Sequence, residues 1–254
     1  MTATLAKIWA DLKADPDEYF RRGFRRFYNT IETLAGECEE GQTVLDLGGD
    51  RRDFAKYPNA ATNGFGHYFR RLGLDYTGIS YHDLDLRFDR LPFADDSFDI
   101  VTSWETIEHL FTYPPGGMLS FDGVLHHWRE AHRVLKPEGL FLVATRNRFC
   151  PLTFQRMQQG IIPQCYIHGV KDGQLVGGHA REFTASELLA IARITETYPH
   201  ASTLCRSSLD PSMERRLLAL RPTIETFLGR ELSTDELGDS IYLMGRKAGQ
   251  AARG

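Results

Sequence analysis

The sequence predicts an α/β fold built around a mostly parallel sheet, on three observations. The segment TVLDLGGD at residues 43–50 is an apolar strand that ends in a carboxylate and two glycines. Such a strand binds nucleotide-type ligands at the edge of an α/β sheet, although a buried strand with a tight glycine turn is the alternative. Apolar segments alternate with segments of helical periodicity, which is typical of parallel sheets. The turn KPEG at residues 136–139 returns a helix to a strand and completes a right-handed βαβ unit.

Capping residues and periodicity predict the individual elements. An N-terminal helix is expected to start with Asp15 as N-cap and Pro16 at its first position, followed by an apolar stripe. The arginines beside that stripe, at positions 21, 22, 25 and 26, are predicted to form a solvated face; contact with an anionic group of a substrate is the alternative. Thr184 and Glu187 predict a capping box on a later helix. Other expected helices cover residues 66–72 and 122–135, and other strands residues 76–80, 97–103, 140–145, 201–205 and 240–246.

The composition excludes several classes of protein. The 254 residues fit one globular domain, and a net charge of -4 disfavours nucleic acid and acidic membranes as partners. No signal-peptide pattern and no apolar run of roughly 20 residues is present, so a cytoplasmic, soluble chain is expected, as a monomer or homodimer. The four cysteines have no paired spacing, which argues against a zinc site or a disulfide framework.

Four motifs in register resemble the class I S-adenosylmethionine-dependent methyltransferases. They are VLDLGG at 44–49, LPFADDSFDIV at 91–101, EHL at 108–110 and RVLKPEG at 133–139. The resemblance covers roughly residues 40–246 and implies a Rossmann-like three-layer sandwich with a seven-stranded sheet whose last strand is antiparallel. It implies S-adenosyl-L-methionine as cofactor and S-adenosyl-L-homocysteine as product. HAREFT at 179–184 is similar to bacterial members of the type 11 group that methylate sugars, glycan precursors and other small metabolites.

The resemblance also implies a set of cofactor-binding residues. Asp46, Gly48 and Gly49 match the positions that hold the methionine and ribose part of the cofactor. Trp104, at the end of the SFDIVTS strand, is assigned to the same site. The family often has further glycines in this loop, whereas this chain has DRR at 50–52. That departure leaves open a second interpretation, a methyltransferase-like fold that binds a partner without catalysis.

A second departure follows the second strand, where the family usually has an acidic residue that binds the ribose hydroxyls. Ser80 stands at that position here, and the interval before residue 91 is too short for the usual helix. We therefore assign Asp83 to the ribose, with Asp85 as its competitor, and Asp89 to the adenine side. The alternative for each carboxylate is simple solvation.

Candidate acid and base groups lie where the carboxyl ends of the strands are expected. Glu105 and His109 follow the SFDIVTS strand, and a neutral histidine could take a proton from an attacking hydroxyl. His179 follows a long insertion and could complete the substrate wall. The alternatives are that the histidines cap a helix or tie down the insertion. The histidines at 126, 127 and 132 are interpreted as surface or packing residues.

The chain is predicted to have three parts. Residues 1–39 form an N-terminal helical segment on the substrate side, residues 40–246 the methyltransferase domain, and residues 247–254 a tail. Within the domain, residues 147–180 form an insertion that sets substrate specificity, with a surface loop as the alternative.

Three functions compete. The favoured one is methyl transfer to an oxygen of a sugar, glycan precursor or related metabolite. The second is methyl transfer to a quinone-like or lipid-linked phenol or to an amine, and the third is the inactive binding module. A nicotinamide dehydrogenase is disfavoured because GGDRRD at 48–53 lacks the G-x-G-x-x-G spacing, and no metal-ligand set is evident.

Overall fold

A computed structural model describes residues 3–15, 21, 23–48, 65–79, 83–112, 120–160, 169–171, 174–176 and 181–249. Several residues of the predicted site therefore lie outside the described part of the chain, namely Gly49, Ser80, His179 and the loop residues 50–52. In the described residues, no helix is long and apolar enough to cross a membrane.

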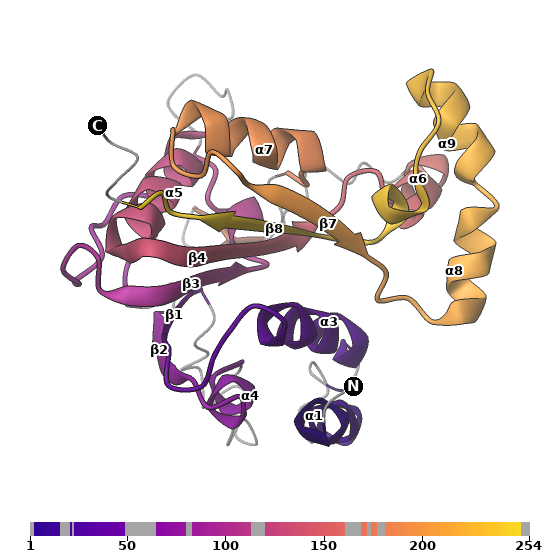
Figure 1. The fold of residues 1–254 in the computed structure, drawn as a ribbon. Helices are drawn as coiled ribbons and strands as arrows, with labels where there is room; N and C mark the ends of the chain where they lie inside the picture. The colour runs from indigo at the N-terminus through magenta and orange to yellow at the C-terminus, as the bar shows by residue number, and fades with distance from the viewer. Residues whose placement is uncertain are drawn as a thin grey trace.

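The main sheet is mostly parallel, as predicted, but the described residues form six strands in it rather than seven (Figure 1). Their order is β2-β1-β3-β4-β8-β7, and β8 runs antiparallel to both of its neighbours, which confirms the antiparallel last strand. The described residues between β2 and β3, where the family would place a further strand, form only turns and irregular chain. The strands are β1 (Thr43–Leu47), β2 (Asp75–Ile79), β3 (Phe98–Trp104), β4 (Leu135–Arg146), β7 (Ser202–Arg206) and β8 (Ser240–Arg246).

Helices cover both faces of the sheet, which gives the expected three layers (Figure 1). Because side chains alternate between the faces of a strand, Phe141 and Val143 of β4 pack toward α5 (Asp122–Val134) and α7 (Ala185–Ile194). Leu140 and Leu142 pack on the other face, toward α1 (Ala3–Lys13), α3 (Phe24–Ala35) and α4 (Phe65–Arg71). The predicted capping box of Thr184 and Glu187 is present at the start of α7.

The N-terminal segment contains more helix than predicted. The apolar stripe is confirmed, since Phe27, Ile31 and Leu34 are buried in α3. However, α1 precedes it and contributes Ile8 and Leu12 to the same core cluster, which the sequence analysis missed. The predicted N-cap, Asp15, is buried, and its carboxylate accepts a hydrogen bond from the hydroxyl of Tyr68 at 2.7 Å.

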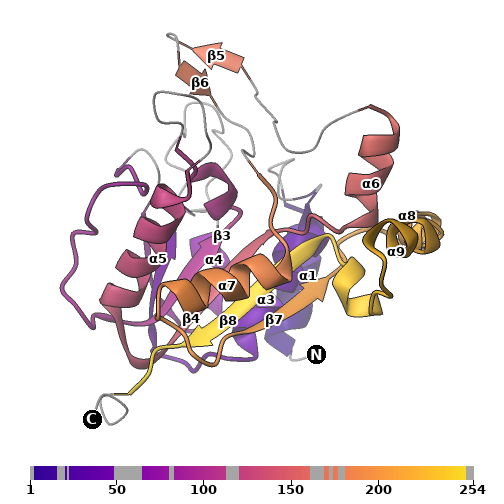
Figure 2. The same ribbon diagram turned by 90° about the horizontal axis from the view of Figure 1, so that it is seen from above.

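Further elements lie beside the carboxyl edge of the sheet (Figure 2). The predicted insertion contains α6 (Pro151–Gln158) and a hairpin of β5 (Gly169–Lys171) and β6 (Gln174–Val176) that stands away from the main sheet. The helices α8 (Pro211–Leu218) and α9 (Arg221–Leu228) were not predicted. Ile224, Leu232 and Leu237 form a small separate core beneath them, and Phe154 of α6 packs against it.

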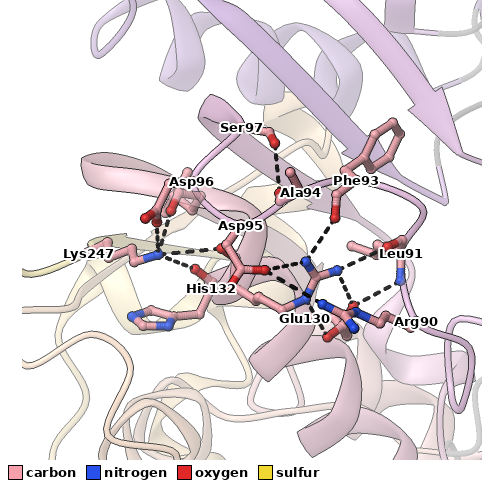
Figure 3. Close-up of polar contacts among 12 residues, drawn as sticks. Arg90, Leu91, Phe93, Ala94, Asp95, Asp96, Ser97, Glu130, His132 and Lys247 are labelled. Carbon is pink, nitrogen blue, oxygen red and sulfur yellow. Dashed lines mark hydrogen bonds and ion pairs between the residues drawn. The ribbon is translucent and has the colours of Figure 1, made fainter.

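Two of the sequence motifs bind each other at the amino end of β3 (Figure 3). The guanidinium of Arg133 donates to the carbonyl oxygens of Phe93 (2.8 Å) and Leu91 (3.0 Å) and pairs with Glu130 at 2.7 Å. The Glu130 carboxylate in turn accepts the backbone N–H of Leu91 at 2.9 Å. These contacts between LPFADDSFDIV and RVLKPEG therefore have a structural function. They lie at the edge of the sheet opposite the carboxyl ends of its parallel strands.

Candidate functional site

The candidate site starts where the order of the sheet reverses. The chain passes from β1 to β2 on one side, whereas β3 pairs with β1 on the other. In open α/β sheets, ligands bind outside the carboxyl ends of the strands at such a point. Gly48 lies there with a φ of +89°, and a Cβ atom at this position would collide with the side chain of Thr106. Glycine is thus required both by the left-handed backbone and by the close approach of the turn after β3.

Asp46, in β1 two residues before Gly48, is fully buried. One carboxylate oxygen accepts a hydrogen bond from Thr102 Oγ1 at 2.9 Å, and the other accepts one from the Tyr76 hydroxyl at 3.1 Å. The donors come from β3 and β2, the two strands that flank β1. The carboxylate therefore braces all three strands at the reversal point, a function that the sequence did not indicate.

The turn after β3 is held against β1 and β4. The Thr106 hydroxyl contacts the carbonyl oxygens of Leu47 (3.1 Å) and Trp104 (2.9 Å), and the Glu105 N–H donates to the carbonyl of Ala144 at 2.8 Å. Trp104 itself is buried, and its ring lies edge-on to that of Phe69. Its surroundings are those of a core residue, and its assignment to the cofactor site stays a prediction.

Glu105 occupies an unusual backbone conformation and is bound by two arginines. Its φ is +48°, a region that non-glycine residues adopt at a cost of order 1–3 kcal/mol and that is frequent at functional sites. Glu105 Oε2 lies 3.2 Å from a guanidinium nitrogen of Arg26 and 3.1 Å from Nε of Arg146. The predicted solvated face of α3 is thus wrong for Arg26, whose side chain is 12% exposed, and the anionic group that it contacts belongs to the protein.

Arg146 extends this network to β8. A guanidinium nitrogen of Arg146 lies 3.4 Å from a carboxylate oxygen of Asp239, which is itself buried and accepts hydrogen bonds from the backbone and side chain of Ser208. The charges of Glu105 and then Asp239 raise the pKa of Arg146 despite its burial. The network joins α3, β3, β4 and β8 at one edge of the sheet, and the sequence analysis missed it apart from Glu105.

The two polar residues of the EHL motif have opposite environments. His109 ends the short helix η1 (Ile107–His109) and is exposed, whereas Glu108 is completely buried. Glu108 Oε2 accepts a hydrogen bond from Thr145 Oγ1 at 2.9 Å. Burial, and then the nearby charge of Glu105, raise the pKa of Glu108 to about 8, so this carboxyl is protonated at neutral pH. Sequence reasoning singled out His109 and missed Glu108, although both belong to the quoted motif.

The predicted ribose and adenine carboxylates lie on an exposed turn after β2. The carboxylate of Asp89 accepts the backbone N–H of Asp85 at 2.8 Å. The competitor Asp85 pairs with Arg87 at 2.7 Å, and this hydrogen bond lowers the pKa of Asp85. The assignments of Asp83 and Asp89 stay predictions. The described residues contain no group of three side chains suited to hold a metal ion.

Comparison with known proteins identifies a methyltransferase domain. A family model for a methyltransferase domain matches residues 19–203. A protein of Mycolicibacterium smegmatis described as a probable S-adenosylmethionine-dependent methyltransferase is 28% identical over 169 residues, which are 65% of this chain and 55% of the relative. The chain therefore spans little more than half of that relative's length.

A solved structure supports the fold. The SAM-dependent methyltransferase of Thermotoga maritima, described as a possible histamine N-methyltransferase, matches with a TM-score of 0.50 and 19% identity, over 94% of this chain and 99% of that one. This likeness concerns the fold alone. With the motifs in register and the family model over most of the chain, the conclusion is direct: this chain belongs to the methyltransferase domain family, and its relatives use S-adenosylmethionine.

Proposed function

We propose that this chain transfers the methyl group of S-adenosylmethionine to a small-molecule acceptor bound above the carboxyl ends of β1, β3 and β4. The observation that carries the proposal is the left-handed turn at Gly48, which ends β1 at the reversal point of the sheet and lies next to the turn of the strained Glu105. Gly48 and Glu105 follow the neighbouring strands β1 and β3. A cofactor bound at Gly48 would therefore lie next to an acceptor bound at Glu105.

The described residues fit this cofactor. The left-handed turn at Gly48 ends β1 at the reversal point, where such sheets bind ligands, and the buried carboxylate of Asp46 lies two residues before it. When bound, the cofactor supplies an electrophilic methyl group on a sulfonium, so the protein mainly has to hold a nucleophile in line and exclude water. Gly48 and Asp46 would hold its methionine end, and Glu105 and His109 would orient the acceptor and take its proton.

The acceptor we favour is an oxygen of a sugar, glycan precursor or related metabolite, on the resemblance of HAREFT to that group. Much of this motif has a local function at the start of α7. Thr184 caps the helix, Arg181 pairs with Glu187, and the Glu182 carboxylate accepts a hydrogen bond from Thr153 Oγ1 at 3.0 Å.

An amine is the second candidate, and the charges at the end of β4 favour it. Four acidic residues act electrostatically on Arg146, namely Glu105, Asp239, Glu108 and Glu182. Among the described residues, Arg26 is the second guanidinium bound to this group. With Glu108 neutral, three acidic groups still face these two guanidinium groups, and an ammonium or amine acceptor would complement that excess, whereas a neutral sugar would not.

Calorimetric titration with S-adenosylmethionine and S-adenosylhomocysteine tests the cofactor first. We expect micromolar binding of both, followed by methyl transfer to sugars or to amines in an acceptor screen read by mass spectrometry. Absence of heat, together with an unchanged melting temperature, would favour the inactive binding module. Turnover with amines alone would reject the sugar acceptor and retain the enzyme.

Replacement of His109 tests the proposed base. We expect His109→Ala to lower kcat by roughly a hundredfold, because a positioned acid or base contributes about 10²–10⁴-fold. Binding of S-adenosylmethionine should not change, since His109 lies on the acceptor side. His200→Ala is the matched control, because His200 is exposed in the loop between α7 and β7. A His109→Ala variant as fast as the parent would leave this histidine without a part in proton transfer.

A further inference from the structure

Glu108 is an acidic residue in a fully buried position. It lies in η1, and its Oε2 accepts a hydrogen bond from Thr145 Oγ1. Its second oxygen, Oε1, is buried and has no hydrogen-bond partner among the described residues. Buried polar atoms in native proteins almost always have partners, so this carboxyl calls for an explanation.

Glu108 and Glu105 form an asymmetric pair three residues apart. Glu105 is held as a carboxylate by two guanidinium groups, Arg26 and Arg146. Glu108 has no guanidinium within 4 Å in the described chain, and the side chain that donates a hydrogen bond to it is the hydroxyl of Thr145. Neighbouring carboxyl groups whose environments drive their protonation apart are typical of sites where acid and base functions are divided.

The charges around Glu108 favour its neutral form. Burial has the largest effect and raises its pKa, and the carboxylate of Glu105 acts in the same direction. A backbone hydrogen bond of Glu108 itself, the Thr145 hydroxyl and the guanidinium of Arg146 oppose them, but the pKa still reaches about 8 against an ordinary value of 4.5. Above that pH, an ionised Glu108 would repel Glu105 in the turn that also carries His109.

We propose that Glu108 is a positioning residue for methyl transfer: as a neutral carboxyl it holds the turn of Glu105 and His109 against β4, and turnover requires this neutral form. The inference rests on the proposed function, since it assigns a task to a neighbour of the acceptor site. It predicts that the enzyme loses activity as the pH rises through the region where Glu108 ionises, while the cofactor still binds.

The stability of the folded protein has the same pH dependence. The pKa of Glu108 is higher in the folded chain than in the unfolded chain, so the folded state binds more protons between pH 4.5 and about 8. Its contribution to stability is therefore fully present below pH 4.5 and is lost as the pH rises through about 8. This dependence is measurable without any substrate.

The test is a pair of pH profiles for the parent and three variants. Glu108→Gln keeps the shape of a neutral carboxyl, so kcat should keep its neutral-pH value and lose the alkaline decline of about tenfold per pH unit. Thr145→Val removes the hydroxyl that lowers the pKa of Glu108, so the decline should move to higher pH. Glu231→Gln, at an exposed position, is the control and should match the parent.

Melting temperatures of the same proteins between pH 5 and 9 give the second readout. Relative to the parent, Glu108→Gln should gain stability progressively as the pH rises. The inference would be overturned if kcat of Glu108→Gln fell at alkaline pH as it does in the parent protein. It would also be overturned if the decline in Thr145→Val occurred at the same pH as in the parent protein. Calorimetry separates failure of the inference about Glu108 from failure of the proposed function. If the cofactor gives no heat with any of the proteins, the proposed function itself fails.

Discussion

Asp46→Asn should lower the affinity for S-adenosylmethionine by about tenfold to a hundredfold and leave the chain folded. A hydrogen bond from a cationic group to a carboxylate contributes about 1.5–3 kcal/mol, and asparagine removes the charge while it keeps the shape. Asparagine is the right replacement because Asp46 is fully buried and accepts hydrogen bonds from Thr102 and Tyr76. Alanine would leave both hydroxyl groups without an acceptor and would mix a loss of stability with a loss of binding. Calorimetric titration measures the affinity, and a thermal melt verifies the fold.

Thr102→Val and Tyr76→Phe are the matched controls for this variant. Each removes one hydroxyl that Asp46 binds and retains the carboxylate. If Asp46 contacts the cofactor, both controls should bind it nearly as well as the parent. If Asp46 acts only as a brace between strands, the three variants should weaken binding to a similar extent. Parental affinity of Asp46→Asn would remove this residue from the cofactor site.

The strands could be predicted because their sequences are apolar runs bounded by turn residues. β1, β3 and β8 have nearly every residue buried, so their patterns need no knowledge of the neighbouring chain. The helices α8 and α9 are different: they are short, and Ile224 is the one fully buried residue of α9 in the small core beside them, with Leu228 packed against it. Their helical state depends on that packing, which a local pattern does not contain.

The number of strands found among the described residues, six rather than the predicted seven, has a related reason. The residues themselves indicated six strands, and the seventh came from the resemblance to the family. The short interval before β3 was visible in the sequence, and it does contain only turns where the chain is described. Local evidence was the better guide to this edge of the sheet.

The candidate site was predictable in position and less so in detail. Glu105 and His109 were expected after β3, and both lie there. Their partners come from distant parts of the chain: Arg26 precedes Glu105 by 79 residues, and Asp239 follows Arg146 by 93. Within EHL, Glu108 is buried and His109 is exposed, and this depends on how η1 is oriented against β4. Sequence spacing alone does not determine that choice.

The largest effect on stability is expected at Lys247, where the sequence analysis placed the start of a tail. Lys247 instead continues the pairing with Gly139, and its ammonium group is buried at the end of α5 (Figure 3). It donates to the carbonyl oxygens of His132 (2.9 Å) and Leu135 (2.6 Å), and it pairs with Asp96 at 2.5 Å. A cation at this position satisfies the carbonyl groups that the last turn of a helix leaves without partners.

Lys247→Met should therefore lower the free energy of unfolding by about 3 kcal/mol, because it leaves several buried carbonyl groups unpaired at about 1–3 kcal/mol each. The melting temperature should fall by about 10 °C, and urea unfolding measures the free energy directly. Arg246→Met is the matched control, since the neighbouring arginine is 52% exposed and its ion pair with Glu37 should contribute less than about 1 kcal/mol. Asp96→Asn separates the two functions of Lys247: Asp96 is 45% exposed, so a small loss there assigns the stabilisation to the carbonyl groups of α5. A loss in Asp96→Asn as large as that in Lys247→Met would assign it to the ion pair instead, and a loss below about 1 kcal/mol in both would contradict the prediction.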